Sequence, residues 1–149
     1  MSPTSAPGAN MVGIPTEEEQ LAGYAIKDID EMEGTYRGAF KLARAELGVE
    51  AFGLQVLDLP PNLDQFPEHD HADDGQQEVY VPLSGTGEIE IEGERHPLQP
   101  GTMVMVGPGV NRRFFTGEET LRLLAIGGTP GKAYEVVDGT ELGAPDPLA

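Results

Sequence analysis

The strongest constraint on the fold is a series of short strand-like runs between residues 51 and 127. Each run is rich in apolar residues, and Gly, Pro or Asn separates it from its neighbours. Short strands at this spacing are typical of an antiparallel sandwich or barrel. The sequence therefore predicts an all-β fold. The predicted strands are 51–59, 78–83, 88–93, 102–106, 112–115 and 120–127.

Two segments add detail to this prediction. In EIEIEG, the glutamates point to one face of a strand and the isoleucines to the other, and Glu92 with Gly93 forms a two-residue hairpin turn. The segment TYRGAFKLARAELGVE carries both helical and strand signals. We expect a strand there, followed by a turn at Leu47 and Gly48.

The length of 149 residues suits a single domain. The first 20 residues are rich in Ser, Pro, Gly and Glu, a composition that buries too little apolar surface to offset the entropy of ordering. We expect a disordered or loosely docked arm over 1–20, a folded domain over 21–137 and a flexible tail over 138–149.

The charge of the chain limits its partners. Twenty-six Asp and Glu against nine Lys and Arg give a net charge of -17, so phosphate backbones and anionic membranes repel it. Without cysteine, a metal must be held by His, Asp, Glu or water. No leader-like or transmembrane-length stretch stands out. We expect a cytoplasmic protein that binds a small molecule, and neither nucleic acid nor membrane.

The stretch PEHDHADDGQQEVYVPLSGTGE carries the candidate metal ligands. On a strand, His69 and His71 would present their imidazoles to one side. Glu78 begins the next strand, which we expect to pair with the histidine strand in a hairpin. Two imidazoles and one carboxylate suit a divalent transition metal, Fe, Mn, Ni, Zn or Cu. The alternative is that both histidines only satisfy hydrogen bonds in a core.

The same stretch resembles the first motif of the cupin superfamily, in which His-x-His is followed by Glu, six residues and Gly. Those positions are His69, His71, Glu78 and Gly85, and GTMVMVGPG resembles the second motif. The resemblance covers residues 55–127. It implies an antiparallel cupin (double-stranded β-helix, or jelly-roll) barrel, often a homodimer, with metal or ligand at the mouth between two sheets.

The chain departs from the family pattern at three places. Gly107 stands where the pattern has Pro, and Pro108 and Gly109 keep the turn. Six residues, ADDGQQ, separate His-x-His from Glu78, where metal-binding members have about four, and this change keeps Glu78 on the same face. Arg112 stands where the second motif has its histidine ligand. A guanidinium has no lone pair and a metal cation repels it, so Arg112 cannot coordinate. Arg113 shares this defect, and His96 precedes a proline at a strand end and suits the surface.

Two arrangements remain open. In the first, His69, His71 and Glu78 hold a metal and Arg112 binds an anionic substrate, as in an oxygenase or isomerase acting on a small metabolite. In the second, Arg112 pairs with Glu78 in place of the metal, and the barrel is a non-catalytic module that binds or senses a ligand. A purely structural barrel, with its mouth filled by side chains, is the third reading.

Overall fold

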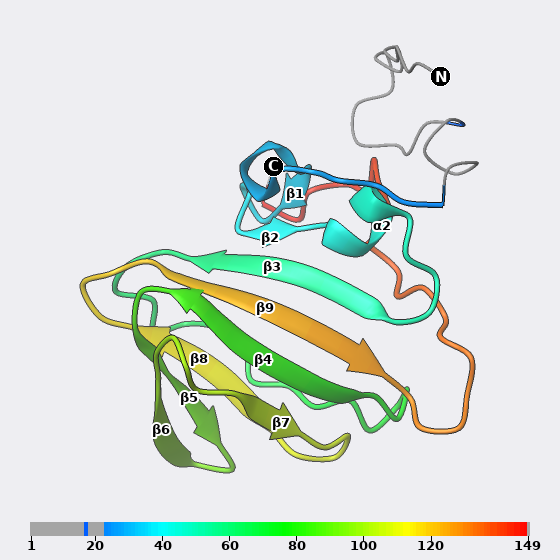
Figure 1. Ribbon diagram of the computed structural model, residues 1–149. Coiled ribbons are helices and arrows are strands. Elements are labelled where there is room, and N and C mark those ends of the chain that lie inside the picture. The colour runs from blue at the N-terminus through cyan, green and yellow to red at the C-terminus, as the bar shows by residue number, and fades with distance from the viewer. Residues whose placement is uncertain (1–16, 18–22, 149) are drawn as a thin grey trace.

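The computed structural model of the protein describes Glu17 and residues 23–148. The predicted arm over 1–20 therefore lies outside the described residues, apart from Glu17. Nine strands and two short helices follow one another in the described part of the chain (Figure 1). They are η2 (Ile29–Glu31), β1 (Gly34–Thr35), β2 (Phe40–Lys41), α2 (Ala43–Leu47), β3 (Gly53–Leu59), β4 (Gln77–Ser84), β5 (Gly87–Ile91), β6 (Glu94–Leu98), β7 (Val104–Val106), β8 (Arg112–Thr116) and β9 (Leu121–Gly128).

The strands form two antiparallel sheets. The larger has the order β1-β2-β3-β9-β4-β7 and the smaller has the order β6-β5-β8. Figure 1 shows α2 and the β1–β2 pair on the side of β3 that faces away from the smaller sheet. The predicted all-β cupin barrel is confirmed, with the smaller sheet facing the long strands β3, β9 and β4.

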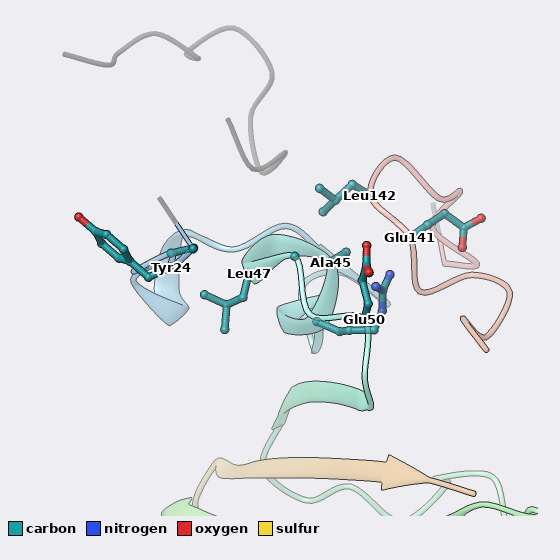
Figure 2. A pocket seen from close by; sticks show the side chains of 10 residues that line it. Tyr24, Ala45, Leu47, Glu50, Glu141 and Leu142 are labelled. Atoms are coloured by element: carbon teal, nitrogen blue, oxygen red, sulfur yellow. The ribbon is translucent and has the colours of Figure 1, made fainter. Parts of the chain in front are cut away.

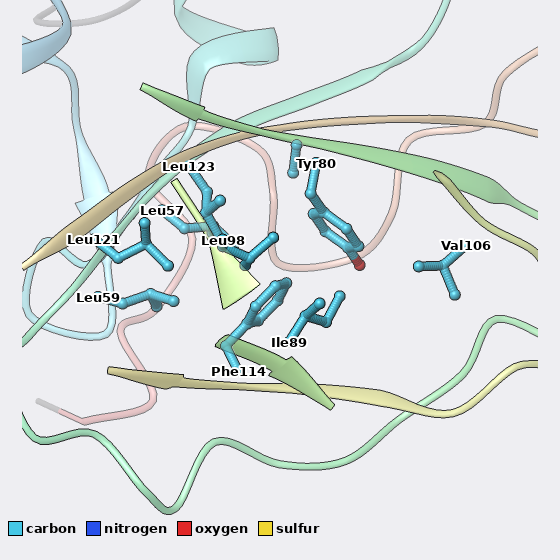
Figure 3. Close-up of a cluster of buried hydrophobic side chains, with 10 residues drawn as sticks. Leu57, Leu59, Tyr80, Ile89, Leu98, Val106, Phe114, Leu121 and Leu123 are labelled. Atoms are coloured by element: carbon cyan, nitrogen blue, oxygen red, sulfur yellow. The ribbon is translucent and has the colours of Figure 1, made fainter. Parts of the chain in front are cut away.

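The core lies between the two sheets (Figure 3). Residues of β9 alternate between buried and partly buried, as expected of a strand with one face on the core. Leu123 pairs with Leu57 of β3, and both side chains point inward. Opposite them, Ile89 and Phe114 project from the smaller sheet into the same cluster. Burial of these side chains is the main stabilising contribution to the barrel.

The predicted strands match β3, β4, β5, β7, β8 and β9 to within a few residues. The predicted hairpin turn is also present, because Glu92 and Gly93 have φ of 50° and 85° between β5 and β6. Positive φ at both central residues is what a tight hairpin turn of this hand requires. Ile89 is fully buried, as its place in EIEIEG predicts.

The expected strand and turn in 35–50 is wrong in part. Thr35 ends β1 and Phe40–Lys41 forms β2, but Ala43–Leu47 forms α2. Ala, Arg, Glu and Leu favour helix, and Gly48 ends it in a left-handed conformation with φ of 75°. The helix buries Ala43 against Met32 and Val56 on the outer face of β3. Strand β6 was given no range among the predicted strands, although the predicted hairpin turn at Glu92 and Gly93 requires a strand after it.

The segment after β9 returns over the outside of the barrel. The Asp146 carboxylate accepts hydrogen bonds from the backbone N–H groups of Tyr36 and Arg37, both at 2.9 Å. Gly143 N–H donates to the Glu33 carboxylate at 2.7 Å. These bonds join residues 143–146 to the β1–β2 turn and to Glu33, which precedes β1. No helix of the described residues has the length and apolar character needed to cross a bilayer.

Candidate metal centre

The histidine segment is held by β8 and by the turn before it. His69 and Arg112 form an antiparallel bridge, with N–H to carbonyl distances of 3.1 and 2.9 Å. His71 N–H donates to the Pro108 carbonyl at 2.6 Å. The expected hairpin between this segment and the strand of Glu78 is therefore wrong. Both edges of β4 are already occupied, because Glu78 pairs with Gly127 of β9 and with Val106 of β7.

The loop ADDGQQ turns the chain from the histidines into β4. Carboxylates of Asp70 and Asp74 accept hydrogen bonds from the N–H groups two residues ahead, both at 3.0 Å. Gly75 has φ of 72°, a conformation that glycine adopts without steric cost, and its N–H donates to the His71 carbonyl at 2.8 Å. The two extra residues of this loop are thus accommodated by local turns.

Glu78 points inward from the start of β4, on the same face as Tyr80. Its Oε1 atom lies 3.2 Å from Nε2 of His71 and 3.5 Å from Nη2 of Arg112. The hydroxyl of Tyr80 donates a short hydrogen bond to the same oxygen. The carboxylate is mostly buried, and three donor groups surround one of its oxygens.

The three candidate ligands converge as the sequence predicts. Ligand atoms of His69, His71 and Glu78 all lie within 4.8 Å of one another. Each imidazole also has an acceptor at Nδ1: the Pro67 carbonyl at 3.2 Å from His69, and the Asp74 carboxylate at 3.1 Å from His71. The Pro67 carbonyl favours the tautomer of His69 with the proton on Nδ1, which leaves its Nε2 lone pair for a metal. Nε2 of His71 donates to Glu78 and would release its proton when a metal binds. The donor set therefore fits a divalent transition metal.

Electrostatics couple these groups. The hydrogen bond to Glu78 raises the pKa of His71, helped by the charges of Glu78 and Asp74 and opposed by burial. Burial alone would raise the pKa of Glu78, but hydrogen bonds from His71 and Tyr80 and the charges of His71 and Arg112 hold it below its ordinary value. Burial and the Glu78 charge raise the pKa of Tyr80, so its hydroxyl keeps its proton and donates.

Arg112 is completely buried beneath this cluster. Its Nη1 donates to the Val110 carbonyl at 2.9 Å. Its Nε and Nη2 atoms have no hydrogen-bond partner among the described residues, although Nη2 faces Glu78. An unpaired buried guanidinium is costly, so Glu78 compensates its charge.

A cavity of about 190 Å³ opens beside the ligand cluster. His69, His71 and Glu78 form part of its wall, and Arg112 does not. The remaining wall comes from α2, β3, the loop before β4, the end of β9 and the segment after it. Its residues are Arg44, Gly53, Leu54, Gln55, Gln76, Ala125, Gly127, Tyr134, Val137 and Thr140.

Sequence reasoning missed Arg44 and Tyr134 as pocket residues. Arg44 belongs to the segment that was expected to be a strand, and no motif marks it. Tyr134 follows β9 near the end of the predicted domain, and its hydroxyl approaches Gly53. Gly53 is a usable signal, because a Cβ there would lie 3.1 Å from the Tyr134 hydroxyl. The sequence also offered His96 and Arg113 as possible ligands, and neither lines the cavity. His96 is exposed, and Arg113 pairs with Glu90 at 2.5 Å.

Comparisons with known proteins agree with this architecture. The sequence model of the cupin domain matches residues 55–127. An L-ectoine synthase of Mycolicibacterium gilvum is 29% identical over 121 residues, which cover 77% of this chain and 91% of that enzyme. A cupin protein of Bacteroides fragilis superposes with a TM-score of 0.59 at 22% identity, over 76% of this chain and 91% of that one. A Photorhabdus luminescens protein superposes with a TM-score of 0.55 at 17% identity, over 71% of this chain and 87% of that one.

Proposed function

This chain belongs to the cupin superfamily, and from that premise we propose that it is an enzyme with a mononuclear divalent-metal centre on His69, His71 and Glu78. One observation carries the proposal: the three ligand atoms converge within 4.8 Å beside a cavity. The proposed metal is Fe, Mn, Ni, Zn or Cu, because imidazole and carboxylate ligands accept all of these ions.

The proposed reaction is an oxygenation or isomerisation of a small molecule in the cavity. A metal at this position would supply Lewis acidity or oxygen activation. The protein's part is to hold the ligands: Asp74 and the Pro67 carbonyl fix the imidazole orientations, while Tyr80 and Arg112 fix Glu78. Neutral polar groups in the wall, among them Gln55, Gln76 and Thr140, orient a substrate by hydrogen bonds.

Elemental analysis of untagged protein, purified without chelators, tests the metal centre. We expect about one transition-metal ion per chain, since three protein ligands make one site. Substrate screening then separates the two reaction classes, because an oxygenase consumes dissolved oxygen and an isomerase does not. A chain that stays empty after incubation with each of the five ions would contradict the metal centre.

A second function is favoured by the position of Arg112. Its Nη2 lies 3.5 Å from Glu78 Oε1, so the guanidinium already neutralises the carboxylate that a metal would bind. In this alternative the chain is a metal-free module that binds or senses a small ligand. This alternative is supported if metal-free protein binds one ligand per chain and does not convert it.

We also propose that the chain forms homodimers through the outer face of β4 and β7. Val79 and Met105 are register partners on that face, and Met103 and Met105 are 70% and 60% exposed. Exposed apolar side chains grouped in this way are typical of protein interfaces. Light scattering should give twice the chain mass, and Met105→Glu should reduce it to one chain. A wild-type monomer would contradict the proposal.

A further inference from the structure

Arg44 is the arginine in the wall of the cavity that holds the candidate ligands. It projects from α2 and lines the cavity together with His69, His71 and Glu78. Arg112, the arginine that the sequence motif singles out, is buried outside this wall. A cation in the wall of a small cavity attracts an anionic group, because the partly enclosed surroundings weaken screening by water.

The hydrogen-bonding capacity of Arg44 is largely unused. A guanidinium has five N–H donors, and one of them, at Nη1, reaches the Val49 carbonyl at 2.9 Å. The Nε atom is buried and has no hydrogen-bond partner among the described residues. No ion pair joins Arg44 to a carboxylate of the described part of the chain either. The Nη2 atom is not among the fully buried atoms and makes no hydrogen bond within the described residues, so it can donate to a ligand in the cavity.

The size and polarity of the cavity define the kind of ligand. A volume of about 190 Å³ equals the share of about six water molecules, so the occupant is small. Gln55, Gln76, Tyr134 and Thr140 in the wall are neutral hydrogen-bonding groups. Glu78 is already surrounded by His71, Tyr80 and Arg112. Arg44 is therefore left to balance the charge of a ligand.

We propose that Arg44 binds the carboxylate of a small carboxylic acid in this cavity. The carboxylate accepts from Nη2 of Arg44, while a second polar group of the same molecule faces His69, His71 and Glu78. The inference rests on the proposed function, since it names the substrate class of the same cavity. It also moves the anion-binding role from Arg112 to Arg44.

Internal carboxylates are the competing partners for Arg44. A second cavity, of about 720 Å³, shares Arg44 with the first and is also lined by Glu50 and Glu141 (Figure 2). A rearrangement of either glutamate onto Arg44 would neutralise the guanidinium without any ligand. The experiment must therefore compare a charged probe with an uncharged probe of the same shape.

Calorimetric titration with glycolate and with its amide, glycolamide, makes this comparison on the full chain. We expect glycolate to bind at least about tenfold more tightly, as charge-assisted hydrogen bonds exceed neutral ones. Arg44→Gln should remove most of this preference, Arg44→Lys should keep part of it, and Arg37→Gln should leave it unchanged. Melting temperatures of each variant establish that the fold persists.

The outcomes separate this inference from the proposed metal centre. Equal binding of the two probes, or an unchanged preference in both Arg44 variants, would overturn the role of Arg44. Loss of the glycolate preference in Arg44→Gln with unchanged metal content supports it. If wild-type protein carries no metal and still prefers glycolate, the metal centre fails and the anion site stands.

Discussion

Nη2 of the fully buried Arg112 lies 3.5 Å from Oε1 of Glu78, in a cluster where the family pattern has a third histidine ligand. The guanidinium and a metal cation would therefore share one carboxylate. Their mutual repulsion lowers the affinity of the site for a metal, and the negative charge of Glu78 compensates part of both positive charges. This relationship is central to how the site can be tested by mutation.

Replacement of Arg112 by histidine should strengthen metal binding. Arg112→His removes the buried cation and supplies a neutral imidazole at the position of the missing ligand. We expect an affinity gain of at least about tenfold for Zn²⁺ or Ni²⁺, because each interaction worth about 1.4 kcal/mol changes affinity tenfold. Competition with a chromophoric chelator measures it. Arg113→His is the matched control, because it makes the same substitution at the neighbouring residue, which pairs with Glu90 and not with Glu78. Equal affinities in both variants would contradict the interpretation that Arg112 occupies the place of a fourth metal ligand.

Loss of one imidazole should empty the site. His71→Ala removes a ligand whose Nε2 faces Glu78 at 3.2 Å. We expect metal per chain, counted by elemental analysis, to fall close to zero. The control is His96→Ala, since His96 is exposed and its Nε2 lies 3.7 Å from the Glu94 carboxylate. Full metal content in His71→Ala would remove His71 from the ligand set.

The carboxylate behind His71 should tune metal affinity without touching the metal. Asp74 accepts from Nδ1 of His71 at 3.1 Å, and such partners orient the ring and raise its basicity. Asp74→Asn should weaken metal binding by about 10- to 100-fold. Asp73→Asn, next to it in the same loop, should have no effect. A similar weakening in both variants would indicate loss of loop charge instead of a specific contact.

Strand parity was enough to predict that His69 and His71 point to one side, because parity is a local property, and the resemblance to the cupin motif added Glu78 to them. The pairing of the histidine segment with β8 was not predictable in the same way, since it depends on which strands already occupy the two edges of β4. Arg44 escaped notice because α2 is too short for periodicity to distinguish it from a strand. Tyr134 reaches the cavity from the end of β9, a contact between segments that are distant in sequence.

The turn at Gly85 should be intolerant of any side chain. Gly85 has φ of 78°, and an added Cβ would overlap the Thr120 carbonyl oxygen, which belongs to the backbone and has little room to move. Gly85→Ala should lower the free energy of unfolding by at least about 2 kcal/mol. Gly107→Ala is the control, since a Cβ there meets nothing within 4 Å. Urea denaturation measures both, and equal stabilities would contradict this account of the turn.

The contact of Asp146 with the β1–β2 turn should depend on pH. Backbone hydrogen bonds from Leu148, Arg37 and Tyr36 hold the pKa of Asp146 below its ordinary value. A carboxylate with a lowered pKa stabilises the docked segment above its unfolded pKa of about 4, and this contribution is lost as the pH falls through the lowered value. Hydrogen exchange of the Tyr36 and Arg37 amides should therefore be slow at pH 6 and become faster as the pH falls below about 4, after correction for the intrinsic rates. Asp146→Ala should remove the protection over this whole pH range. If the wild-type amides exchange like those of Asp146→Ala at pH 6, the segment is not docked in solution.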